Sequence, residues 1–282
     1  AGGHIVGGHM NAMNDGMIDF SSNNRADGIT LAGPARIFNG SSLQIHANLV
    51  NNGTITVNPT AGGNGTFVQA LSTQGLNGTG EVVLNASTNL DTAYITYNGG
   101  GEVLTHAATH TIRGTGRVYV SLANDGLVHA DRDARVLELL GISKTNNATM
   151  KSSNGGILAV TSIGLTQAPT AQLLGDGGSV RIFGTTISGG QVNATNGGLS
   201  SVTGNSRFNT VSISGPFHVN NGVALQIADG LTNNGTITVN PSMSSSGTFI
   251  QVLNSQTFGG SGAIYLNANP ANLDTGYIFY KG

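Results

Sequence analysis

Residues 51–59 read Asn-Asn-Gly-Thr-Ile-Thr-Val-Asn-Pro, and residues 233–241 repeat this stretch letter for letter. The offset between the copies is 233 − 51 = 182 residues. The same offset carries Leu-Gln-Ile at 43–45 onto Leu-Gln-Ile at 225–227. A repeat of this length indicates an architecture in which each unit packs mainly against its neighbours.

The matches extend on both sides of the repeated stretch. We predict an internal duplication in which residues 7–100 correspond to residues 187–282, with intervening coils at 101–186. Glycine and asparagine are spread evenly through all three blocks, and no stretch has the composition of a linker. The sequence therefore predicts one continuous solenoid over residues 1–282.

Shorter units lie within the long repeat. Apolar-x-Gly-x-Gly-x-apolar occurs at 76–82, 112–118 and 258–264. Glycine and asparagine tolerate positive φ and so turn the chain sharply. Threonine, isoleucine and valine favour a pleated, half-buried strand. A turn and a short strand, repeated without helical spacing, predict an all-β fold: a parallel β-helix, or β-solenoid, with a long internal duplication.

The apolar stretch at 134–140 is too short for a stable isolated helix, and we predict a buried strand there. With about 20–25 residues per coil, the range for short structural repeats, the chain makes roughly a dozen coils. Other expected strands include 54–57, 127–130 and 157–161.

Composition limits the possible functions. Glycine makes up 44 of 282 residues, and charged residues are 9%, against about 25% in typical domains. A net charge of −2 and the lack of basic clusters argue against a nucleic-acid partner. The chain has no cysteine, which excludes disulfides and thiolate metal sites. No apolar stretch reaches the roughly 18 residues of a membrane span, so we expect no membrane insertion.

The Asn-Asn-Gly-Thr-Ile-Thr-Val and Gly-Thr-Gly-x-Val units resemble those of bacterial cell-surface and secreted β-helix proteins, the autotransporter passengers and haemagglutinin-like adhesins. The resemblance implies a right-handed parallel β-helix and an extracellular or cell-surface location. The repeats would supply a rigid rod with a long side face, and no set of residues demands catalysis. We therefore expect a structural or adhesive segment of a larger bacterial surface or secreted protein, with a glycan or cell-surface ligand as partner. The resemblance implies no active site, because these passengers share none.

The solenoid pattern continues to both ends of the chain. We therefore expect an excised piece of a longer protein. Unpaired strand edges at the two ends would act as templates for another chain. End-to-end self-association is the expected consequence.

One cluster of ionisable residues suggests catalysis. Asp131, Arg132 and Asp133 lie together, and two carboxylates on one face of a strand can divide acid and base roles in glycoside hydrolysis. This arrangement would suit a polysaccharide-active lyase or hydrolase. The alternative is a solvated turn in which the charges neutralise each other. We favour the turn, and with it a protein that is not an enzyme.

A second candidate is a patch of one aspartate and two tyrosines. Tyrosine offers an amphipathic face that can stack on sugar rings. In the alternative, the tyrosines pack a coil corner and the aspartate caps a turn. The patch occurs once in each copy of the duplication, as Asp91, Tyr94 and Tyr97, and as Asp274, Tyr277 and Tyr280.

His106 and His110 are four residues apart, a spacing that on a helix could present two imidazoles to zinc. Glycines flank them and no acidic residue accompanies them as in the metalloprotease motif. We therefore expect polar surface histidines. No nucleotide-binding loop or nucleophile elbow is present, and we expect no metal or cofactor.

Overall fold

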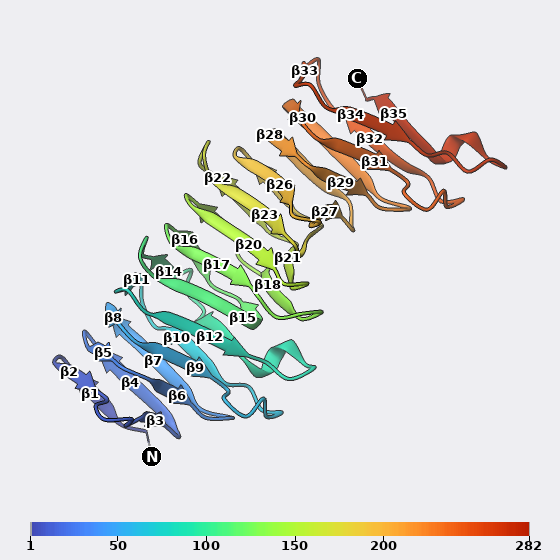
Figure 1. The fold of residues 1–282 in the computed structure, drawn as a ribbon. Coiled ribbons are helices and arrows are strands. Elements are labelled where there is room, and N and C mark those ends of the chain that lie inside the picture. The colour runs from blue at the N-terminus through green and yellow to red at the C-terminus, as the bar shows by residue number, and fades with distance from the viewer. Residues whose placement is uncertain (1, 282) are drawn as a thin grey trace.

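The computed structural model describes residues 2–281, so the outer bounds of the predicted solenoid, residues 1 and 282, lie outside the described residues. The chain winds into a parallel β-solenoid of about 12 turns, which confirms the predicted fold class (Figure 1). The only helical elements described are the short 3-10 turns η1 (Leu90–Thr92) and η2 (Leu273–Thr275). Within the described chain, no helix is long and apolar enough to cross a membrane.

Each coil contributes to three ladders of parallel strands, and a strand pairs with its counterpart one coil later. Three long strands, β15 (Thr111–Val118), β28 (Ser206–Ser214) and β30 (Ala224–Asn233), bend across two ladders. The first ladder continues the end of β15 and contains β1 (His4–Val6), β4 (Asn23–Asp27), β7 (Ser42–Ala47), β10 (Phe67–Ala70), β13 (Tyr94–Tyr97), β18 (Val136–Leu140), β21 (Ile157–Thr161), β24 (Ser179–Phe183), β27 (Leu199–Val202), β29 (Pro216–Val219), β31 (Thr236–Val239) and β34 (Ala263–Leu266).

The second ladder includes the starts of β28 and β30 and contains β2 (His9–Asn11), β5 (Thr30–Ala32), β8 (Leu49–Asn51), β11 (Gln74–Asn77), β14 (Val103–His106), β16 (Ser121–Asn124), β19 (Lys144–Asn146), β22 (Gly164–Gln167), β25 (Thr186–Ser188), β32 (Thr248–Val252) and β35 (Gly276–Tyr280). The third includes the start of β15 and the ends of β28 and β30, and contains β3 (Ile18–Phe20), β6 (Ala35–Ile37), β9 (Thr54–Val57), β12 (Glu81–Asn85), β17 (Leu127–Ala130), β20 (Thr149–Ser153), β23 (Gln172–Asp176), β26 (Gln191–Thr195) and β33 (Phe258–Gly259).

The core follows from the alternation within the repeated stretch. Ile55 and Val57 in β9 are fully buried, while Thr54 and Thr56 face outward. Ile55 stacks in register with Val82 of the next coil, and Val82 stacks on Ile112 of the one after. Burying each such side chain contributes about 1.5–3 kcal/mol. The stacked aliphatic residues form one core cluster along the rod.

The asparagine before the proline of the repeat is a structural turn residue. Asn58 is buried with φ of 60°, and its side chain bonds the carbonyl of Gly62 at 2.9 Å and that of Thr92, one coil on, at 3.0 Å. Asn240 repeats the arrangement in the second copy, with φ of 59°. The amide therefore closes one turn and ties it to the next coil.

The Gly-x-Gly units form corners where neighbouring coils approach closely. Gly116 in β15 has φ of 147°, and a Cβ there would lie 2.1 Å from the carbonyl oxygen of Ala93. Only glycine fits this position, which explains the unit at 112–118. The chain bends here from the third ladder into the first.

The two copies of the duplicated sequence occupy different faces of the solenoid. β7 and β9 of the first copy belong to the first and third ladders, whereas their equivalents, the start of β30 and β31, belong to the second and first. Coil length varies along the chain, from 94 − 67 = 27 residues at β10–β13 in the first copy to 157 − 136 = 21 residues at β18–β21 in the intervening coils. The 182-residue offset is therefore not a whole number of coils, and equivalent faces point in different directions. The boundaries of the duplication remain a prediction.

Candidate functional site

Asp131 and Asp133 do not form a carboxylate pair on a strand, which corrects the catalytic arrangement considered above. β17 ends at Ala130, and the next residues form a turn before β18. Asp131 lies at its start and binds Arg113 of the preceding coil, at 3.0 Å between Oδ2 and Nη1. Arg132 is more distant, with Nε 3.9 Å from Asp131 Oδ1, and Asp133 is exposed.

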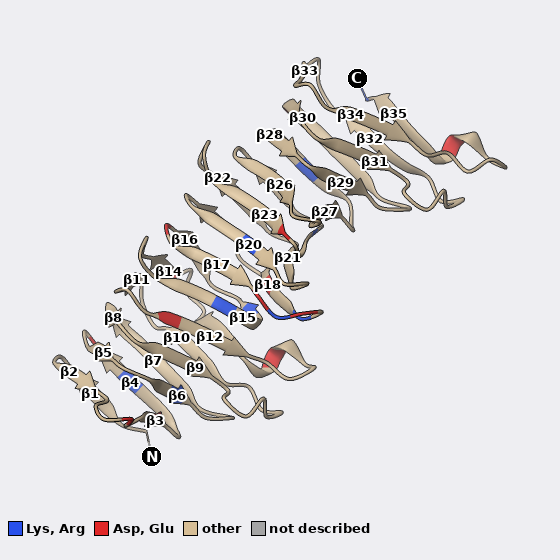
Figure 2. Ribbon diagram, viewed as in Figure 1, with Lys and Arg blue, Asp and Glu red and all other residues tan. Residues whose placement is uncertain are grey.

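Arg113 also bonds Glu81, with Nε 2.5 Å from Oε2. The hydrogen bond from this guanidinium holds the pKa of Glu81 below its usual value. Glu81 therefore stays ionised at neutral pH and is poorly suited to donate a proton. The cluster is therefore an ion-paired surface ladder. Figure 2 shows charged residues in such small separate groups along the rod.

His106 and His110 are buried, so the prediction of surface histidines was wrong. His106 Nδ1 lies 2.6 Å from Asn124 Oδ1, and His106 Nε2 lies 3.1 Å from His110 Nδ1. His110 Nε2 lies 3.0 Å from Asn51 Nδ2. Because an amide nitrogen can only donate, His110 Nε2 accepts; His110 Nδ1 then donates to His106, and His106 donates to Asn124.

The histidine pair belongs to a buried chain of side-chain hydrogen bonds that crosses several coils. Asn124 donates to Asn146 at 2.8 Å, and Asn146 donates to Gln167 at 3.0 Å. Burial, with the neighbouring His106, lowers the pKa of His110 to about 3, and burial also lowers the pKa of His106. Both rings are therefore neutral at pH 7. Across residues 2–281, no group of three or more histidine or acidic side chains is placed to hold a metal ion.

Lys144, in β19, is a buried cation in the adjoining coil. Its Nζ donates to the carbonyl oxygens of Val120, Leu140 and Ile142 at 2.9–3.0 Å. Burial lowers its pKa to about 7. The three carbonyls satisfy all three donors of the ammonium group. Lys144 is thus a structural residue that closes a corner.

Tyr94 of the second candidate patch packs on the solenoid surface. Its ring stacks on Phe67 of the preceding coil, with centroids 5.0 Å apart, and Tyr277 stacks on Phe249 in the same way at 5.3 Å. Tyr97 packs against the core and stacks on Tyr119. Tyr94 and Tyr97 thus pack against other aromatic rings, but from within the strand β13 and not at a coil corner.

The aspartates of the patch do not cap the turns, which corrects that part of the alternative. Asn89 caps η1, because its side chain accepts from the backbone nitrogen of Asp91 at 3.0 Å, and Asn272 does the same for Asp274 at 3.1 Å. The Asp91 side chain therefore does not bind the turn; it forms an ion pair with Arg117 instead. Tyr280, the last residue of the second patch, is 58% exposed.

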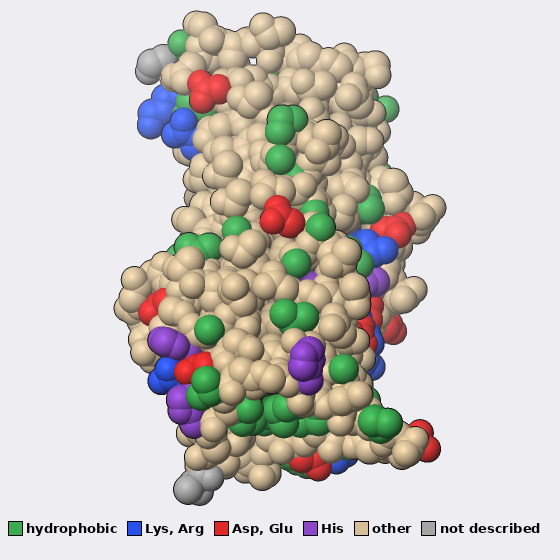
Figure 3. Space-filling view, turned by 90° about the vertical axis from the view of Figure 1, so that its left-hand side faces the viewer, with side chains coloured by type: hydrophobic (Ala, Val, Ile, Leu, Met, Phe, Trp, Pro, Cys, Tyr) green, Lys and Arg blue, Asp and Glu red, His purple; other side chains and the backbone are tan. Residues whose placement is uncertain are grey.

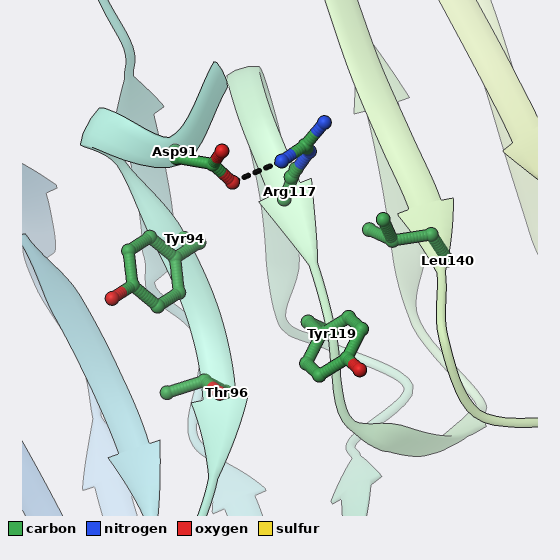
Figure 4. Close-up of a pocket in the computed structure, with 6 residues that line it drawn as sticks. All are labelled: Asp91, Tyr94, Thr96, Arg117, Tyr119 and Leu140. Carbon is green, nitrogen blue, oxygen red and sulfur yellow. Dashed lines mark hydrogen bonds and ion pairs between the residues drawn. The ribbon is translucent and has the colours of Figure 1, made fainter. Parts of the chain in front are cut away.

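Asp91 and Tyr94 line a hollow of about 360 Å³ on the side of the rod (Figure 4). The hollow spans β13, the end of β15 and β18, three consecutive rungs of the first ladder. In Figure 4, Asp91 and Arg117 meet at one end, and Leu140 projects from the third strand. The remaining lining residues are Thr96 and Tyr119.

Arg117 is fixed between two carboxylates. Its Nε lies 2.8 Å from Glu138 Oε2, and its Nη1 binds Asp91. Glu138 also accepts a hydrogen bond from Thr161 at 2.9 Å. Burial, together with the Asp91 carboxylate, raises the pKa of Tyr94, so this phenol is neutral at physiological pH. The hollow thus combines aromatic surface with a carboxylate and a guanidinium.

Asp91 and Tyr94 could be found from the duplicated pattern, whereas Arg117, Tyr119 and Leu140 could not. These three residues lie in the intervening coils, outside the duplicated patch. The Gly-Thr-Gly-Arg-Val unit marks the strand that carries Arg117. Which coil lies beside it depends on coil length, which the pattern does not give.

No protein-family model matches the chain, and no curated protein matches it. One similar solved structure is the crystal structure of a TibC-catalysed hyper-glycosylated TibA fragment. The alignment covers 100% of this chain and 98% of that one, at 14% identity and a TM-score of 0.29. A likeness of this level carries no conclusion about the function of the present chain.

Proposed function

We propose that this chain is a structural and adhesive segment of a larger bacterial cell-surface or secreted protein. The observation that carries the proposal is the continuous stack of coils around one apolar core, from Phe20 to Ile250. Each strand in the stack bonds its counterparts in the neighbouring coils. Such a rod keeps a fixed length, and its side faces are exposed to ligands.

The surface suits display outside the cell. Most of the face in Figure 3 is neither charged nor hydrophobic, and charged side chains form small separate groups. The absence of cysteine makes the fold independent of the redox state of its surroundings. The resemblance of the repeat units to autotransporter passengers and haemagglutinin-like adhesins favours the same setting.

The polysaccharide-active enzyme is less well supported. Asp131 is bound to Arg113, and Asp133 lies exposed in a turn. A glycosidase needs two carboxyl groups on opposite sides of a bound sugar. Asp131 and Asp133 therefore do not provide such a pair.

Two measurements test the proposal. The purified chain is applied to a glycan array, where an adhesive segment should bind a defined subset of glycans. In parallel, it is incubated with acidic and neutral polysaccharides, and reducing ends and unsaturated products are measured. Glycan binding without product release supports the proposal. Product release that D131N/D133N abolishes would establish the enzyme instead, and the absence of both signals would remove the adhesive part.

A further inference from the structure

We propose that the hollow on the first ladder binds one neutral pyranose sugar, with Tyr119 as its stacking surface and the Asp91–Arg117 pair as its hydrogen-bonding end. This inference names the ligand class of the adhesive function and rests on that proposal. At about 360 Å³, the hollow is near the lower end of small-ligand sites, roughly 300–1,000 Å³. Its size suits a single ring better than a long chain.

The hollow is built from two rows of outward side chains. Tyr94 and Arg117, which line the hollow, are paired in register with each other, and Arg117 is paired with Glu138 on the third rung. Thr96, Tyr119 and Leu140, two residues further along their strands, form the second row beside them. Rungs lie about 4.8 Å apart, and residues two apart on a strand about 6.6 Å apart. The two rows therefore form a rigid grid of the dimensions of a sugar ring.

Tyr119 is exposed yet held in place. It is 40% exposed, and its ring stacks on Tyr97 with centroids 5.7 Å apart. It also lies over Gly141, where a Cβ would come within 2.1 Å of the ring. A large apolar ring that is fixed but open to solvent loses little entropy on binding, and tyrosine is well suited to the C–H face of a sugar.

The polar end offers both a donor and an acceptor. The Asp91 side chain is 62% exposed, so its carboxylate can accept from a hydroxyl. Arg117 uses Nε and Nη1 for its two carboxylates, and within residues 2–281 its Nη2 has no hydrogen-bond partner. Adjacent hydroxyls of a pyranose can donate to the carboxylate and accept from the guanidinium at once.

The charge balance selects neutral sugars. Arg117 carries one positive charge, and Asp91 and Glu138 carry two negative charges, so the cluster has a formal charge of +1 − 2 = −1. A uronate or sialate would meet net repulsion here, and its carboxylate would have to displace Asp91 or Glu138 from Arg117. A sugar without a carboxylate meets no such cost.

The second copy of the duplication gives an internal comparison. Asp274 and Tyr277 match Asp91 and Tyr94, but Phe279 stands at the position of Thr96. Within the described chain, no arginine pairs with Asp274 as Arg117 pairs with Asp91. We therefore expect one sugar site on this chain, although the aspartate–tyrosine pattern occurs twice.

The test is saturation-transfer NMR with methyl glycosides of glucose, galactose and mannose, and with glucuronic and sialic acids. Wild-type protein should bind at least one neutral glycoside, and the acids more weakly. Tyr119→Leu keeps an apolar side chain but removes the ring, and should weaken binding roughly tenfold. Asp91→Asn should weaken neutral binding and narrow the gap to the acids. Tyr265→Leu, at a tyrosine that is 57% exposed and lies outside both candidate patches, is the matched control and should bind like wild type.

The outcomes separate this inference from the adhesive proposal. If the acids bind as tightly as the neutral glycosides or more tightly, or if Tyr119→Leu binds like wild type, the proposed sugar site is wrong; glycan binding on the array would still support the adhesive role. If wild type binds no glycan on the array, both the site and the adhesive role are wrong. Circular dichroism of each variant tests whether the coils are intact. Loss of binding by Tyr119→Leu but not by Tyr265→Leu then reports on the hollow.

Discussion

Acidification is expected to loosen the middle of the solenoid through the buried histidine pair. In the folded chain, His110 Nε2 accepts from Asn51, and its Nδ1 donates to His106. A second proton on either ring would place an N–H against another donor. Burial, together with His106, already lowers the pKa of His110 from 6.5 to about 3.

The magnitude follows from proton linkage. Because the folded pKa is the lower one, the unfolded chain binds more protons between pH 6.5 and 3. Stability is complete above the unfolded pKa of 6.5 and falls as the pH decreases towards 3. Between pH 7 and 5 the loss from His110 is about 2 kcal/mol, at about 1.4 kcal/mol per pH unit once the unfolded histidine is protonated. Carboxylates near their usual pKa values titrate little in this range.

The assay is amide hydrogen exchange at pH 7 and pH 5, corrected for the intrinsic pH dependence of exchange. Hydrogen exchange measures local opening, which matters because solenoid coils can open separately. Protection in β14, β15 and β16 should fall roughly 30-fold in wild type. His110→Gln keeps an acceptor for Asn51 and removes one of the two buried titrating rings, while His106 remains, so its protection should fall less than that of wild type. His9→Gln, at an exposed histidine, is the control and should behave as wild type. An equal loss of protection in wild type and His110→Gln would show that His110 does not cause the pH dependence.

Three further outcomes are expected. Gly116→Ala places a Cβ 2.1 Å from the carbonyl oxygen of Ala93 and should lower the free energy of unfolding, measured in urea, by about 1–3 kcal/mol. Gly63→Ala, with open space around it, is the control and should leave this free energy nearly unchanged. Burial lowers the pKa of Lys144 to about 7, so above pH 7 the folded state binds fewer protons than the unfolded state. The local free energy of opening near β19 should therefore rise by about 2 kcal/mol between pH 7 and 9, and hydrogen exchange in Lys144→Met should lack this rise. Ile278→Lys, at an exposed apolar position of β35, should reduce self-association in concentration-dependent sedimentation, and unchanged association would contradict the stacking of end coils.

The fold class, the positions of several strands and the alternation of side chains along them can be predicted from the sequence. A strand was predicted at 54–57, and the alternation of threonine with isoleucine and valine there matches the burial of Ile55 and Val57. Strands at 127–130 and 157–161 were predicted with the bounds observed. The stretch at 134–140 contains the strand β18 (Val136–Leu140), which begins two residues later than predicted because Ala134 lies in a turn. These features are local, because inside–outside alternation has a period of two residues and turn glycines and asparagines mark where it stops.

Which residues contact each other across coils can be seen only in the tertiary structure. Asp91 reaches Arg117 and Arg113 reaches Asp131 only because the coils between them have particular lengths. The same lengths place the two copies of the duplication on different ladders. His106 also shows that a polar residue can face inward when a partner in another coil satisfies it. A repeat pattern fixes neither coil length nor partners, since turns of different length preserve the same strand pattern while changing what stacks above it.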